Sequence, residues 1–249
     1  MLLVCISLSV LSNTLYGLNI RITACRWRLL YRPSSEVFGI WMLIYTWFYV
    51  NVFVQLWANV DDAFYVASLP ANLLAGFAWL CCAVWTTIFK ESQLRLATLT
   101  LVMAASSATA ATVVEQSWRA AGAAKPWQIL STGVPFETFA AWLICAASLS
   151  VGILSASRTR PDSVASCDDD DDEYEQSLLV DASKIGAIER NVPIFVCVAT
   201  GTLAIALPSP VPTVVLLWLG VWLPSRYSPS VIAFGLVAFV IAVVRVSAF

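Results

Sequence analysis

The chain has 249 residues, of which 59% are apolar and only 12% are charged. Because about a quarter of the residues of a typical soluble domain are charged, this composition excludes an ordinary soluble domain. The chain contains no histidine, which removes the commonest metal ligand and the usual general base.

The apolar residues form long unbroken runs, several of which approach or exceed the roughly 20 residues that cross a bilayer as a helix. Only helices and closed barrels satisfy the backbone in lipid, and a barrel needs short alternating segments. We therefore expect an all-α integral membrane protein, a polytopic helical bundle. The predicted helices are, in chain order, 1–20, 36–58, 67–89, 95–116, 131–155, 191–207, 212–223 and 229–248.

The number of membrane-crossing helices depends on the first run and on the runs near the C-terminus. The first run lacks a charged leader and a clear small-residue cleavage site, which favours a retained helix over a cleaved signal peptide. Near the C-terminus, Pro208, Pro210 and Pro212 are expected to end one helix and begin the next. The run 212–223 is short for a full crossing, so the total is seven or eight.

The positive charges predict an orientation if the chain crosses eight times. One side then collects eleven Lys and Arg residues, and the other has three, Arg119, Lys125 and Arg245. The eleven-charge side is expected to be cytosolic. This places the N-terminus on the non-cytosolic side and the segment 156–190 in the cytosol; the sequence does not indicate the organelle.

The segment 156–190 holds most of the acidic residues, since nine of the sixteen lie between Asp162 and Asp181. Adjacent like charges repel and cannot bury apolar surface, which favours a solvated, disordered linker. Two other interpretations stay open. Ser166 precedes a run of acids and suits an acid-directed kinase, and "EQSLL" (175–179) is similar to an acidic dileucine sorting signal.

Candidate catalytic and metal-binding groups are few. The seven cysteines are scattered without a CxxC pair, and we interpret them as buried small apolar residues with no metal site. Glu115 and Glu137 are the acids near helix ends that face a possible cavity, but one carboxylate at each place is weak support for acid–base catalysis. Glu137 suits the start of a helix, where a negative charge is favourable. No nucleotide or hydrolase motif is present, so we expect neither an enzyme nor a cofactor, and no basic patch suggests nucleic acid.

The run 36–58 contains aromatic and amide residues that lipid alone does not require. Trp41, Tyr45 and Phe48 recur on one helical stripe, and Trp47, Asn51 and Gln55 form a neighbouring one. Asn and Gln in a membrane helix face other helices or a cavity, where they find partners. The aromatic residues have two simpler explanations, interfacial anchoring and plain packing between helices, and these stay open beside a cavity.

Several short stretches resemble the tryptophan-rich sensory protein and translocator family, which includes the peripheral benzodiazepine receptor. "RPSSEVFGIWMLIY" (32–45) is similar to the start of that family's second helix, with an aromatic residue followed by Trp-x-x-x-Tyr. "NLLAGFAW" (72–79) resembles its third helix and "VPFETFAAWLICAASLS" (134–150) its fifth, while Asn13 matches an Asn of divergent members. Ser150 stands where the family has an Asn, and the Pro of its Phe-Gly-Pro-Val-Trp form is absent.

The resemblance covers roughly residues 1–155 and implies a five-helix translocator-like core there. The acidic loop 156–190 and the two or three C-terminal transmembrane helices expected within 191–249 go beyond that core. The resemblance also implies a flat hydrophobic ligand, a porphyrin (tetrapyrrole) or a sterol, held in an aromatic cavity by a carrier, sensor or regulator. The expected ligand-binding residues are Trp41, Tyr45, Asn72, Trp79, Trp142 and Ser150.

Two other functions remain open, a structural or accessory subunit of a larger membrane complex and a small transporter. The expected partners are the lipid bilayer and the hydrophobic small molecule, with a homodimer or a membrane complex also open. The small residues of 103–113 allow helix four to pack closely against a neighbour.

Overall fold

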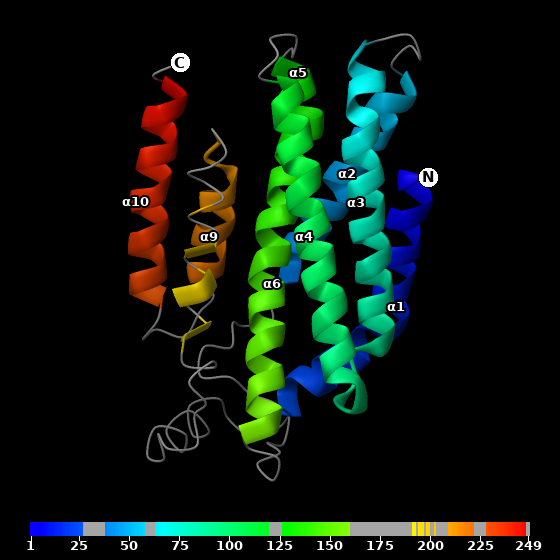
Figure 1. Cartoon of the computed structure of the whole chain (residues 1–249), viewed down its shortest axis with the longest axis vertical. Helices are drawn as coiled ribbons and strands as arrows, with labels where there is room; N and C mark the ends of the chain where they lie inside the picture. The colour runs from blue at the N-terminus through cyan, green and yellow to red at the C-terminus, as the bar shows by residue number, and fades with distance from the viewer. Residues whose placement is uncertain are drawn as a thin grey trace.

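The computed structural model describes residues 1–26, 38–57, 63–119, 126–159, 191–192, 194–196, 198–199, 202, 209–221 and 228–247. All regular secondary structure in these ranges is helical (Figure 1), as predicted. The elements are α1 (Leu2–Arg26), α2 (Ile40–Trp57), α3 (Ala63–Ile88), the 3₁₀ turn η2 (Glu91–Gln93), α4 (Leu94–Trp118), α5 (Pro126–Gln128), the π-helical turn η4 (Ile129–Gly133), α6 (Val134–Thr159), α9 (Val211–Val221) and α10 (Ser228–Ser247).

Four helical stretches are long and apolar enough to cross a membrane, which fits an integral membrane protein. They are Ile40–Trp57, Ser68–Ile88, Leu94–Trp118 and Ile129–Arg158. Shorter apolar helices cover Leu2–Gly17, Val211–Gly220 and Ile232–Ile241.

Most predicted helix boundaries lie within a few residues of the observed ones. The fifth predicted helix, 131–155, is longer than expected, because η4 adds a turn at its start and α6 continues to Thr159. No proline or glycine follows Ile153 before that point, and Arg158 in the last turn suits the negative end of the helix. The predicted helix 191–207 is described only in part, and the acidic segment from 160 to 190 lies outside the described residues.

The bundle packs through small residues. α4 lies between α3 and α6, α1 packs on α3, and α9 packs on both α6 and α10 (Figure 1). The buried face of α4 includes Ala97, Ala104, Ala108 and Ala111, each at most 1% exposed. Because lipid is as apolar as leucine, membrane helices associate through close packing and hydrogen bonds, which small residues permit.

Candidate functional site

A group of eight aromatic rings, here called the aromatic cluster, fills the space between α2, α3 and α6. Its members are Phe38, Trp41, Tyr45, Phe48, Trp79, Phe136, Phe139 and Trp142. Four of the six predicted ligand-binding residues therefore lie together, namely Trp41, Tyr45, Trp79 and Trp142.

Trp79 is at the centre of the aromatic cluster. Its ring stacks on Phe139 with centroids 4.2 Å apart and on Tyr45 at 5.1 Å. Trp41 stacks on Tyr45 at 5.5 Å and meets Trp142 edge-on at 6.2 Å. Offset and edge-on pairs at such separations stabilise by about 0.5–1.5 kcal/mol each, so the rings hold α2 against α3 and α6.

Two polar groups within the aromatic cluster lack hydrogen-bond partners. Trp79 and Trp142 are 0% exposed, and the Nε1–H of each has no acceptor. A buried donor without an acceptor costs about 1–3 kcal/mol. Trp41 and Tyr45 are only half-buried, so the α2 side of the aromatic cluster is its more accessible side.

The predicted residue Asn72 is not part of the aromatic cluster but belongs to a buried amide network. Its Nδ2 donates to Oε1 of Gln55 at 2.7 Å, and Nε2 of Gln55 donates back to Oδ1 of Asn72 at 3.2 Å. The same Nε2 donates to Oδ1 of Asn51 at 2.9 Å. The amides of α2 thus bind another helix, as their stripe predicted.

The π-helical turn η4 provides further partners for α2. Trp47 donates through Nε1 to the carbonyl oxygen of Leu130 at 3.1 Å, and Asn51 donates through Nδ2 to that of Ser131 at 2.8 Å. Val134 N–H donates to Ile129 O, five residues back, which widens the turn. Irregular turns are tolerated in membrane helices when neighbouring side chains satisfy the backbone, and α2 does so here.

Ser150, the sixth predicted residue, lies apart from both groups. Its hydroxyl pairs with the hydroxyl of Thr98 on α4 at 2.9 Å. This contact is two turns along α6 from Trp142, and through it Ser150 joins α4 to α6.

A second polar site, here called the charged cluster, joins α4, α6 and the start of α9. Nη2 of Arg119 lies 2.7 Å from Oε2 of Glu115 and 2.5 Å from Oε1 of Glu137. The carboxylates are only 2% and 1% exposed. The expectation of two separate carboxylates is therefore wrong, because both converge on one guanidinium.

Within the charged cluster, Glu137 receives more hydrogen bonds than Glu115. Besides Arg119, Glu137 accepts a hydrogen bond from Nε2 of Gln116 at 3.0 Å and another from the hydroxyl of Ser209. Ser209 in turn accepts the backbone N–H of Val211 at 3.2 Å and so caps α9. Neither carboxylate oxygen of Glu115 has a hydrogen-bond partner, and Oε2 meets Arg119 as an ion pair only.

Gly133 leaves room for the guanidinium of the charged cluster. A Cβ at this position would lie 2.8 Å from Cζ of Arg119, closer than real Cβ contacts come. The guanidinium thus packs directly on the glycine backbone of η4. One signal in the sequence pointed to this site, the spacing of four residues between Glu115 and Arg119, which places both on one helical face.

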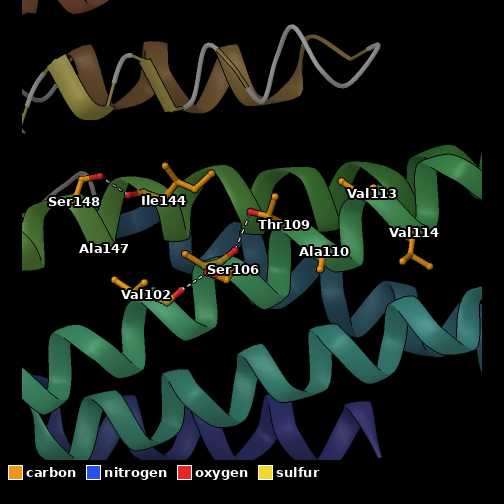
Figure 2. A pocket seen from close by; sticks show the side chains of 10 residues that line it. Val102, Ser106, Thr109, Ala110, Val113, Val114, Ile144, Ala147 and Ser148 are labelled. Carbon is orange, nitrogen blue, oxygen red and sulfur yellow. Dashed lines mark hydrogen bonds between the residues drawn. The ribbon is translucent and has the colours of Figure 1, made fainter.

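Two grooves also mark the bundle surface. One, of about 670 Å³, runs between α4 and α6 (Figure 2). Its hydroxyls are used within their own helices, since Ser106 donates to the carbonyl of Val102 and Ser148 to that of Ile144. The other groove, of about 310 Å³, lies between α1, α2 and α3, and both Gln55 and Asn72 line it.

The cysteines of the described residues are consistent with their predicted packing role. Cys5, Cys81, Cys82 and Cys145 are all buried. Within the described ranges, no three His, Cys, Asp or Glu side chains are grouped so that they could hold a metal ion.

The fold and these sites define a class, an all-helical protein with four potential membrane spans, a filled aromatic cluster and buried charges. No family model matches the chain, and neither a curated protein nor a solved structure matches it.

Proposed function

We propose that this protein binds a flat hydrophobic small molecule against the aromatic cluster, as a carrier, sensor or regulator of the translocator type. The observation that carries the proposal is the pair of buried indole N–H groups of Trp79 and Trp142, which have no acceptor. A ligand with a carbonyl or carboxylate at its edge would supply acceptors, and its flat face would stack on the rings. Porphyrins and sterols are the ligand classes that the family resemblance implies.

The packing of α2 supports a route for the ligand. α2 makes fewer contacts with the other helices than α3 makes with α4, and it contributes the half-buried rings of Trp41 and Tyr45. Separating these rings from Trp79 and Trp142 would exchange ring–ring contacts for ring–ligand contacts of similar energy. In this proposal α2 is the movable wall of the site.

The proposal includes the translocator-like organisation of the chain. A five-helix core spans 1–155, the acidic loop 156–190 is cytosolic, the C-terminal helices lie in 191–249, and the N-terminus is non-cytosolic.

Titration of the purified protein with protoporphyrin IX tests the proposal through quenching of tryptophan fluorescence. We expect saturable quenching that weakens at least tenfold in Trp41→Leu. The matched control is Trp57→Leu, on the same helix, since Trp57 is 90% exposed and outside the aromatic cluster. Equal affinity in both variants would refute porphyrin binding at this site, and a parallel titration with a fluorescent sterol distinguishes the two ligand classes.

A second function, a structural subunit of a membrane complex, is favoured by the close packing of the aromatic cluster. Trp79, Trp142 and Phe139 are fully buried, as rings that serve only to join helices would be. Absence of saturable binding for both ligand classes, in a protein that keeps its helical content, would favour this function over the first.

A further inference from the structure

The charged cluster contains one more negative charge than positive charge. Glu115 and Glu137 each carry one negative charge when ionised, and Arg119 carries one positive charge. Within the described part of the chain, Arg119 is the one cation paired with either carboxylate. An uncompensated charge in a low-dielectric interior is costly, and such groups are neutralised or paired.

The hydrogen bonds indicate which carboxylate is left without compensation. Glu137 accepts from Arg119, Gln116 and Ser209, and the N-terminus of α9, capped by Ser209, adds a favourable dipole. Hydrogen bonds to a carboxylate stabilise its negative charge, and in this cluster the donors gather on Glu137.

Glu115 has a much poorer set of partners. Both of its carboxylate oxygens are buried and receive no hydrogen bond; Oε2 forms an ion pair with Arg119 at 2.7 Å, and Oε1 has no partner of either kind. A bound metal cation would need several oxygen ligands in place of this one free oxygen and a neighbouring guanidinium. A proton needs only the one oxygen.

We propose that the charged cluster is a site for a single exchangeable proton, bound at Oε1 of Glu115, with Arg119 shared between Glu115 and the ionised Glu137. Proton uptake forms the Oε1–H bond and brings the formal charge of the cluster from −1 to zero; proton release reverses both changes. Glu115 lies one turn before the end of α4. Buried ionisable residues within membrane helices mark ion pathways or proton relays.

Infrared difference spectroscopy of the full-length protein in vesicles tests this proposal. The pH is stepped between values above about 5.5, where exposed carboxyls are already ionised, and the stretching band of a protonated carboxyl is recorded. We expect the unsubstituted protein to show one such band, which shifts in D₂O and disappears reversibly as the pH rises.

Three variants assign the band. Glu115→Gln should abolish it, and so should Glu137→Gln, because Arg119 then compensates Glu115 alone. Glu175→Gln, which removes a carboxylate of the acidic segment, should leave the band unchanged. The band is measured in variants that keep their helical circular dichroism. Loss of the band in either cluster variant assigns it to the charged cluster.

Two results would overturn the proposal. One is a band that persists in Glu115→Gln, and the other is the absence of any titrating band in the unsubstituted protein. The second result is expected if another cation, such as Lys125, which lies outside the described residues, already neutralises the cluster.

Discussion

Replacing Gln55 and Asn72 with leucine, singly and together, tests whether the amide network holds α2 against α3. The two side chains exchange a pair of hydrogen bonds of 2.7 and 3.2 Å between the helices. Interhelical hydrogen bonds in a membrane contribute about 0.6 kcal/mol each on average. We therefore expect a coupling free energy of about 1.2 kcal/mol between the two positions.

The single substitutions should each cost more than their share of the double substitution. Gln55→Leu also removes the bond to Asn51 at 2.9 Å, which lies within α2, so its cost should exceed the roughly 1.2 kcal/mol of the two interhelical bonds. Either single variant leaves the partner amide buried and unpaired, whereas the double variant removes both amides together. Removing both partners of a buried hydrogen bond therefore costs less than the sum of the two single substitutions.

The free energies of unfolding are measured in mixed micelles with rising fractions of sodium dodecyl sulfate, followed by circular dichroism. The control cycle pairs Gln55→Leu with Phe53→Leu, on the same helix, because Phe53 is 61% exposed and lies outside the amide network. That cycle should be additive within about 0.3–0.5 kcal/mol. Additivity of Gln55→Leu and Asn72→Leu within the same range would refute the network.

Two further predictions follow from the close contacts. In Gly133→Ala the added Cβ displaces the guanidinium of Arg119. The resulting loss of stability should be smaller than the roughly 3–5 kcal/mol of removing one partner from a buried ion pair. It should also be larger than the gain of about 1 kcal/mol that alanine has over glycine in a helix. A net loss of about 1–2 kcal/mol by the same unfolding assay is expected, against little change in Gly39→Ala, whose Cβ would meet nothing within 4 Å. Four cysteines are buried, namely Cys5, Cys81, Cys82 and Cys145. Peptide mass spectrometry should therefore find them unlabelled by maleimide in the folded protein and labelled in dodecyl sulfate. Labelling of the folded protein as fast as that of the unfolded protein would contradict this packing.

The helices were predictable because each depends on local information. Apolar runs of membrane-spanning length define α2, α3 and α4, and Pro210 and Pro212 define where α9 begins. The stripe of Asn51 and Gln55 also correctly indicated a face that contacts other helices. Such patterns need no knowledge of which helix is the neighbour.

The partners across the bundle were not predictable in the same way. Asn72 and Trp79 share one face of α3, but the structure separates them, since Asn72 pairs with Gln55 while Trp79 stacks on Phe139. The convergence of Glu115 and Glu137 on Arg119 depends on the rotation of α6 relative to α4. Helical periodicity within a single segment does not contain that rotation.

The π-helical turn η4 changes the orientation of the side chains before it relative to those after it. An α-helix advances by about 100° per residue, so one extra residue in a turn offsets every earlier position by about that angle relative to the later ones. Trp127, before the turn, is 44% exposed, whereas Phe136 and Phe139, after it, are buried. A one-residue deletion within 129–133 would remove this phase offset. The side chains of Pro126–Gln128 would then rotate toward a different neighbour, while those from Val134 onward would keep their orientation.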